Sequence, residues 1–554
     1  MSGNAAARAA RRVCCSPTRI AMGPLAFATV GFIVMATMTL VRTPYRQLLP
    51  YEIAMFAVAL VFLAVWGALW LRARRLRARS AAESNSKPGS TSKAAPSSPK
   101  PVLAMVAAVV AIMAVLLGLV FDNNWHIRMY SHSDVRTVRL GAVTGSFASV
   151  IVRDPTAKSI TVTLTAPETK KFDVTVPVTQ DNDFVGIARF TGLSGGAEHA
   201  VQVKNDRGED VKPASGQELK IKTLPTKNPD SFKVAFGSCN LPFPYRHGMA
   251  GFKNVLDMKP DLFLHMGDFI YADVPFQVGD STENFRRLYR RNLNDAYYME
   301  LAQSVPSLHM FDDHEIFDNW VAGAPPVPYA PTALAVYREH VHNAMPHEAD
   351  PVKPNPTWFY NVTVGSNLAT IFMSNTRAFR KPASTPAASS KDLESADATF
   401  LGSDQLAAID AWLQDAQQRN VTWKVFVSSV PFSPNYVDPD TWYGARRERA
   451  AILKRADELG VHNLIVLSGD RHEVGVFEIP RNLEGARSVE FSVSPLHAFY
   501  DDLPSIKEEI EPILFKDAGA RSYAGAIEIS EQEVKFAVRR MGEPLYDLTV
   551  KRTK

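Results

Sequence analysis

Residues 307–320, SLHMFDDHEIFDNW, join a short apolar run to a dense cluster of charge. The run has the length and composition of a buried strand. Four acids and a histidine follow it within seven residues: Asp312, Asp313, His314, Glu315 and Asp318. Acids packed this closely repel one another, and burying an unpaired charge is costly. The stretch therefore predicts a buried strand whose end is stabilised by bound cations.

Three further apolar runs end in side chains of the same kinds. Cys239 ends FKVAFGSCN, Asp268 and Tyr271 lie in DLFLHMGDFIYAD, and Asp470 and His472 lie in NLIVLSGDRHE. Binding sites of open α/β sheets gather at the carboxyl ends of the strands. A single Gly-Asp turn or a single buried cysteine carries little information. Four such clusters in one part of the chain predict a shared site.

The side chains of this predicted site are those of a metal centre. Carboxylates and imidazoles bind divalent and trivalent cations, and a thiolate beside a phenolate indicates a softer ion such as iron. The remaining oxygen ligands suit calcium, manganese or magnesium. A carboxylate shared by two metal ions would hold them about 3.5–4 Å apart, as in phosphate-ester hydrolases. The residues therefore favour metal-assisted hydrolysis.

Three apolar stretches lie near the start of the chain, at residues 20–41, 53–71 and 102–121. Each is about long enough to cross a bilayer. Arginine and lysine concentrate before the first stretch and in the Ser/Pro/Lys-rich loop 72–101, for which the composition predicts disorder. The positive-inside rule then places the tail 1–19 in the cytoplasm. The sequence predicts a multi-pass membrane protein with three spans and an extracytoplasmic catalytic domain.

The composition argues against several other functions. The formal net charge is only +4, and much of the basic excess lies in the first 100 residues, so specific nucleic-acid binding is not expected. Cys14, Cys15 and Cys239 are the three cysteines, and their spacing supports no disulfide framework. The three apolar stretches contain no charged residue, which argues against transport.

Two folded regions are expected after these stretches. Short alternating segments in residues 134–224 predict about seven strands, the pattern of a small immunoglobulin-like or fibronectin-like β-sandwich. Residues 230–545 alternate strands, polar loops and helices, and they contain every cluster of the predicted site. The second region is therefore the predicted catalytic domain.

Five motifs in this order, FGSCN, GDFIYAD, DDHEIFDNW, LGSDQLAAIDAWL and SGDRHEVGVFEI, resemble those of a PhoD-type alkaline phosphatase/phosphodiesterase. That family belongs to the calcineurin-like metallophosphatase superfamily, and the resemblance covers residues 134–545. It implies an α/β fold, a four-layer β-sandwich flanked by helices, preceded by the small all-β sandwich. It also implies a metal-dependent hydrolase of phosphate mono- or diesters, in which a hydroxide bridging the metals attacks phosphorus.

The resemblance also implies roles for individual residues. The implied metal ligands are Cys239, Asp268, Tyr271, Asp313, Asn319, Asp470 and His472. Cys239 and Tyr271 would bind iron (Fe³⁺), and Asp268 would bridge it to calcium, which manganese or magnesium could replace. Asn319 has a second interpretation, as a cap of the following turn.

His314 and Arg377 are the implied catalytic residues. His314 occupies the position of the family's catalytic histidine and is the candidate general acid. Arg377 either contacts phosphate or pairs with a structural acid. The chain departs from the family pattern at Asn375, which replaces an acid, and at Tyr443 and Ala445. These departures concern substrate preference more than metal binding. The alternative function is a non-catalytic cell-surface binding or adhesion protein with a structural metal cluster.

Overall fold

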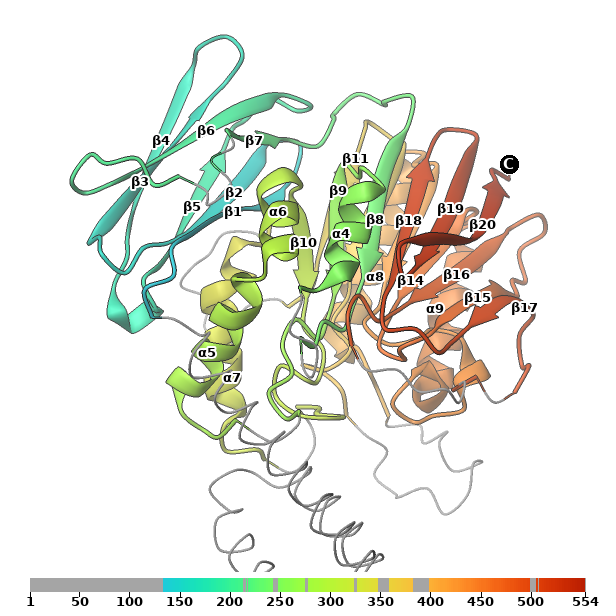
Figure 1. Ribbon diagram of the computed structural model, residues 1–554. Coiled ribbons are helices and arrows are strands. Elements are labelled where there is room, and N and C mark those ends of the chain that lie inside the picture. The colour runs from blue at the N-terminus through green and yellow to red at the C-terminus, as the bar shows by residue number, and fades with distance from the viewer. Residues whose placement is uncertain are drawn as a thin grey trace, which may run out of the picture. The chain divides into compact units, whose positions relative to one another are not determined.

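The computed structural model describes residues 133–553, except residues 213–215, 217, 243–247, 275–277, 323–325, 347–357, 382–397, 499–504 and 507. The elements described below belong to one compact unit, residues 119–272 and 280–554. Figure 1 shows how they are arranged.

The predicted membrane topology is not supported. Among the described residues, no helix has both the length and the apolar composition that crossing a bilayer requires. The longest helix there, α8, has 17 residues, whereas a span needs about 20 apolar residues. The three predicted spans, the tail 1–19 and the loop 72–101 lie outside the described residues. On this finding, the predicted localisation as a three-span membrane protein with an extracytoplasmic catalytic domain is wrong.

Two small antiparallel sheets form the first folded region. One contains β1 (Thr137–Val143), β2 (Phe147–Arg153) and β5 (Val185–Thr191), in that order. The other contains β4 (Lys171–Pro177), β3 (Ser159–Thr165), β6 (Glu198–Asn205) and β7 (Leu219–Lys222). These strands match the number expected in residues 134–224. The immunoglobulin-like or fibronectin-like topology stays a prediction.

Two larger sheets form the second region. The six-stranded sheet has the order β10 (Ser307–Met310), β9 (Leu262–Met266), β8 (Phe232–Gly237), β18 (Tyr523–Ile529), β19 (Glu533–Arg540), β20 (Glu543–Lys551). The seven-stranded sheet has the order β11 (Tyr360–Val364), β12 (Ala369–Met373), β13 (Trp423–Val427), β14 (Leu464–Ser468), β16 (Ser488–Val493), β15 (Val474–Ile479), β17 (Ile513–Asp517). Phe491 of β16 stacks on Phe536 of β19, with ring centroids 4.1 Å apart. The two sheets therefore pack face to face as a β-sandwich.

Helices flank this sandwich (Figure 1). On the six-stranded side lie α4 (Ala250–Asp257), α5 (Thr282–Leu293), α6 (Ala296–Ser304) and α7 (Ala330–His340), and on the other side lie α8 (Gly402–Gln418) and α9 (Arg446–Glu458). Short 3-10 turns are η1 (Gln180–Asn182), η2 (His342–Ala344), η4 (Pro434–Tyr436) and η5 (Trp442–Ala445). Trp412 of α8 and Ile452 of α9 share a buried cluster with Phe372 and Phe426 of the sheet. The predicted mixed α/β fold is confirmed.

The small sandwich is fixed to the larger region by buried contacts. All residues of β1 and β2 are buried. The Ser149 hydroxyl donates to the Ala344 carbonyl at 2.8 Å, and the Gln303 amide donates to the Val138 carbonyl at 3.1 Å. An inter-domain contact of this kind restrains relative movement. The described part of the small sandwich therefore belongs to the scaffold of the larger region.

Candidate metal centre

Four strand ends bring the predicted residues together. Cys239 follows β8, Asp268 follows β9, Asp313 follows β10 and Asp470 follows β14. Because β8, β9 and β10 run parallel, their carboxyl ends lie at one edge of the six-stranded sheet. The end of β14 brings in the fourth group from the seven-stranded sheet. The site therefore lies where the two packed sheets present their strand ends.

The backbone at this edge adopts an uncommon conformation. Five non-glycine residues of the predicted site have positive φ angles: Cys239 (65°), Asp268 (56°), Asn319 (60°), Asp470 (76°) and His472 (55°). Such residues cost on the order of 1–3 kcal/mol each, and they cluster at functional sites. Main-chain hydrogen bonds hold two of them in register, since Cys239 N–H donates to the Gly267 carbonyl and Asn240 N–H to the Asp268 carbonyl.

Carboxylate oxygens converge at the centre. Ligand atoms of Asp268, Asp312, Asp313 and Asp470 all lie within 4.8 Å of one another, and Asp268, Asp313 and His314 form a second group of the same kind. We call the first set the four-acid group. Such a spacing fits oxygen and nitrogen ligands of a small metal cluster.

A sulfur and a phenol extend the centre on one side. The Asp268 Oδ2 atom lies 3.4 Å from the Cys239 thiol and 3.2 Å from the Tyr271 hydroxyl. The Tyr271 hydroxyl also lies 2.9 Å from His472 Nε2. The structure therefore brings together Cys239, Asp268, Tyr271 and His472, four of the metal ligands that the resemblance implies.

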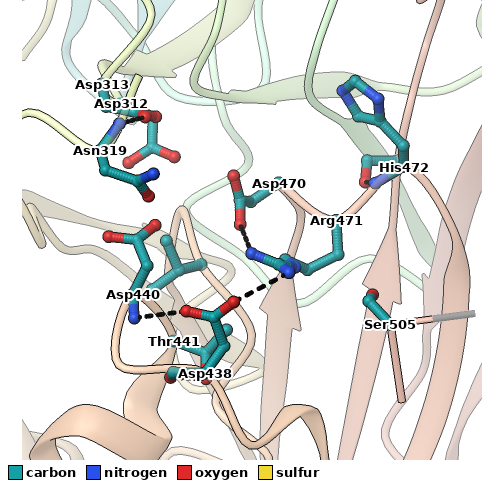
Figure 2. Close-up of polar contacts among 12 residues, drawn as sticks. Asp312, Asp313, Asn319, Asp438, Asp440, Thr441, Asp470, Arg471, His472 and Ser505 are labelled. Atoms are coloured by element: carbon teal, nitrogen blue, oxygen red, sulfur yellow. Dashed lines mark hydrogen bonds and ion pairs between the residues drawn. The ribbon is translucent and has the colours of Figure 1, made fainter. Parts of the chain in front are cut away.

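His314 and Asn319 lie at the rim. His314 is half-buried, its ring stacks on Tyr271 with centroids 4.2 Å apart, and its backbone N–H donates to Asp268 Oδ1 at 3.4 Å. Asn319 is exposed, and its backbone N–H donates to Asp313 Oδ2. Figure 2 shows the Asn319 side chain between Asp313 and Asp440. The contact to the four-acid group is thus made by the backbone of Asn319, and its role as a ligand stays a prediction.

Arg377 lies beneath the four-acid group with no exposed surface. It donates to Asp312 and Asp313, in each case at 3.2 Å, and to both oxygens of Asp440 at 2.6 and 2.9 Å. Arg380 shares Asp440 at 2.6 Å. Of the two interpretations of Arg377, the contacts favour pairing with structural acids over a phosphate contact.

Burial governs the electrostatics of the centre. Desolvation, reinforced by the neighbouring acids, holds the pKa of Asp268 and of Asp470 well above the usual range. Desolvation also raises the pKa of Asp313 to about 7, against the opposing charges of Arg377 and His314. The protein's own cations therefore do not offset the charge that these acids would carry when ionised.

The centre fits a bound metal. Asp470 Oδ2 is buried without a hydrogen-bond partner among the described residues, and Arg471 Nη1 lies 3.7 Å from it. A buried carboxylate oxygen that accepts no hydrogen bond remains able to bind a metal ion. Carboxylate, imidazole, thiol and phenol side chains in one place fit metal binding, and the identities iron and calcium stay a prediction.

Three acids of the centre were not assigned roles from the sequence. Asp312 belongs to the four-acid group, and Glu315 accepts hydrogen bonds from the backbone of Phe269 at 2.7 Å and of Asp312 at 2.9 Å, tying two strand ends together. The density of acids in residues 312–318 was the available signal. Asp440 comes from a distant loop, and its pairing with Arg377 left no local trace.

Comparisons with known proteins show the family of this chain and a structure with a similar fold. The model of the family described as PhoD-like phosphatase matches residues 234–554. Alkaline phosphatase D of Bacillus subtilis (strain 168) is 26% identical over 320 residues, which cover 50% of this chain and 53% of that protein. The chain therefore spans about half the length of this curated relative. The solved structure titled "Structure of PhoD" is similar with a TM-score of 0.60 and 19% identity, covering 75% of this chain and 88% of that one.

Proposed function

Because the chain belongs to the PhoD-like phosphatase family, we propose that it is a metal-dependent hydrolase of phosphoric esters. The observation that carries the proposal is the convergence of the four-acid group with His314, Cys239 and Tyr271 at one edge of the sheets. A purely structural metal site closes its coordination shell, whereas a catalytic site leaves room for substrate. Here His314 and Asp470 are half-buried, so the centre reaches the surface.

The residues that would hold the metal ions divide into two groups. Cys239 and Tyr271, with Asp268 beside them, would hold iron, and Asp268 with Asp312 and Asp313 would hold calcium or another hard ion. Asp470 and His472 would complete the set of ligands. Bound ions would supply Lewis-acid stabilisation of the charge on the phosphoryl group. We also propose that the chain belongs to the calcineurin-like superfamily.

The chain's own groups would orient the acids and move the proton. Arg377 and Glu315 fix the acids, because together they bind Asp312 and Asp313 from the buried side. His314, held against Tyr271 at the rim, would donate a proton to the oxygen of the leaving group. The strained backbone at Cys239, Asp268 and Asp470 would keep the ligands in place before substrate binds.

The test combines elemental analysis with turnover of two chromogenic probes, the monoester p-nitrophenyl phosphate and the diester bis-p-nitrophenyl phosphate. We expect stoichiometric iron and calcium in the purified full chain, hydrolysis of at least one probe, and loss of both metal and activity on chelation. Asp410→Asn is the matched control, because Asp410 lies on α8 and pairs with Arg455 away from the centre. Metal without turnover would instead support the non-catalytic binding protein.

A further inference from the structure

Three arginines approach the acids of the centre, and they differ in exposure. The side chains of Arg377 and Arg380 are 0% and 5% exposed, and both are bound to buried carboxylates. Arg471, which directly follows Asp470, is 22% exposed. A solute that reaches the centre from outside can therefore meet Arg471, while Arg377 and Arg380 face inward.

The guanidinium of Arg471 lies between two acids, as Figure 2 shows. Its Nη2 atom is 3.1 Å from Asp438 Oδ2, and its Nη1 atom is 3.7 Å from Asp470 Oδ2. Asp470 belongs to the four-acid group. Arg471 is thus a cation at the edge of the candidate metal centre, and one of its partners is a candidate ligand.

Asp438 is the fixed member of this contact. Its Oδ1 atom accepts the backbone N–H of Asp440 at 2.9 Å, and its carbonyl accepts the Thr441 hydroxyl at 2.8 Å. Arg471 has a long side chain with several rotatable bonds and an exposed surface. A rearrangement at the rim would therefore move Arg471 while Asp438 remains in its turn.

Cation binding by Asp470 would weaken its attraction for Arg471, which would retain Asp438 as a partner. A guanidinium binds phosphate oxygens through paired N–H groups. Building on the proposed function, we propose that Arg471 binds the phosphate group of the substrate and that the carboxylate of Asp438 limits the positive charge offered there. The pair Asp438–Arg471 then favours the singly charged phosphodiester over the doubly charged phosphomonoester.

Two substitutions at this pair should shift the preference between monoester and diester in opposite directions. Removing the guanidinium lowers the local charge by one unit, which disfavours a doubly charged monoester more than a diester. Removing the carboxylate of Asp438 raises the local charge by one unit, which favours the doubly charged monoester more than the diester. A purely structural role would reduce turnover of both probes in parallel.

The experiment measures kcat and KM for the two p-nitrophenyl probes at about pH 8, above the second pKa of a phosphomonoester near 6. For Arg471→Gln we expect KM to rise about tenfold or more for the monoester, and less for the diester. For Asp438→Asn we expect the monoester-to-diester ratio of kcat/KM to rise, by about threefold to tenfold. The double variant should return the ratio toward that of the unchanged protein. Arg471→Lys should recover part of the KM effect.

Binding of inorganic phosphate, followed by calorimetry on the metal-loaded chain, supplies a readout that does not depend on turnover. We expect phosphate affinity to fall in Arg471→Gln and to stay unchanged in Arg455→Gln, a control at a half-exposed arginine paired with Asp410. An Arg471→Gln protein with unchanged probe ratio and unchanged phosphate affinity would overturn the inference while leaving the proposed function intact. If the chain hydrolyses neither probe but binds phosphate through Arg471, the proposed hydrolase function is wrong and the phosphate-binding role of Arg471 stands. If the chain neither hydrolyses a probe nor binds phosphate, both proposals are wrong.

Discussion

Two buried aspartates show how differently this protein treats negative charge. Asp183, near the contact between the small sandwich and the helices, pairs with Arg153 at 3.0 Å, with Arg290 at 2.5 Å and with His340 at 3.3 Å. Burial alone would raise the pKa of Asp183, but hydrogen bonds from His340 and Arg153 outweigh it and hold the pKa well below its usual range.

Asp268 is also buried, and its neighbours are other acids. Desolvation is the largest influence on its pKa, and Asp312 and Asp313 add to it, so the pKa of Asp268 is held well above its usual range. Asp183 is stabilised by cations that the chain supplies. Asp268 fits a site where the cations come from outside the chain. The two pKa shifts have opposite directions because Asp183 has cationic partners within the chain, whereas Asp268 lies among other acids.

The largest expected effect comes from removing the charge of Asp268. Asp268→Asn should lower kcat for the phosphate-ester probes by about a hundredfold to a thousandfold, because a preorganised electrostatic contact to the reaction is lost. Metal content by elemental analysis should fall in parallel. In chelator, the melting temperature should not drop, since the substitution removes a buried carboxylate that lies among other acids. A large loss of stability in chelator would erase the contrast with Asp183.

The matching substitution at Asp183 should have the reverse profile. Asp183→Asn leaves the buried guanidinium groups of Arg153 and Arg290 without their shared acid, which should cost about 3–5 kcal/mol of unfolding free energy. Urea denaturation measures this loss. Metal content and turnover per folded molecule should stay near those of the unchanged chain. An active-site phenotype without loss of stability would contradict the structural role of Asp183.

Glu490 of β16 provides an intermediate case. It is buried and accepts hydrogen bonds from the backbone of Phe432 and Ser433 and from the Ser468 hydroxyl. Desolvation nevertheless raises its pKa from 4.5 to about 7. Protonation of Glu490 therefore contributes to the stability of the folded chain. This contribution is fully present below about pH 4.5 and is lost as the pH rises through about 7.

Replacing Glu490 should flatten the pH dependence of stability. The unfolding free energy of the unchanged chain should fall between pH 4.5 and 7. In Glu490→Gln this fall should be smaller by about 2–3 kcal/mol. Urea denaturation at several pH values, in chelator, measures the slope. Glu528→Gln is the control, because Glu528 is a half-exposed acid on β18. An unchanged slope would show that the hydrogen bonds offset the burial of Glu490 completely.

The smallest effect is expected at the surface pair Asp410–Arg455. The two side chains are 39% and 41% exposed, and Arg455 Nε lies 2.6 Å from Asp410 Oδ1. Exposed ion pairs contribute little to stability because water and salt screen them. Asp410→Asn should leave the melting temperature, metal content and turnover unchanged within error. A clear loss in any of these would mean that charge pairing alone, without burial, matters in this chain.

The sequence indicated which side chains would lie together where the signal was local. Cys239, Asp268 and Asp470 each follow an apolar run, and strand geometry brings the ends of such runs to one edge. Arg377 and Asp440 were harder, because their pairing joins segments 63 residues apart. Nothing beside Arg377 in the sequence indicates that its guanidinium is buried beneath acids rather than open to phosphate.

The surroundings of Arg471 show a second limit. Its neighbours Asp470 and His472 were predicted from the motif, but Arg471 was assigned no role from the sequence. Its contact with Asp438 depends on the turn at residues 438–441, which only the fold brings beside β14. Hydrophobic periodicity in the sequence predicts the strands, and ligand-type residues at the strand ends predict a metal centre. The charged groups that surround the centre can be identified only from the three-dimensional structure.

The complete burial of β1 and β2 has a consequence for how the chain is made. Their partners Gln303 and Ala344 are synthesised long after these strands. At about 5–20 residues per second, roughly 10–40 s separate the emergence of Arg153 from that of Ala344. During that interval the nascent small sandwich presents an apolar face that has no cover. We expect ribosome-bound chains that stop before α7 to be captured by chaperones, and chains that pass η2 to be released from them.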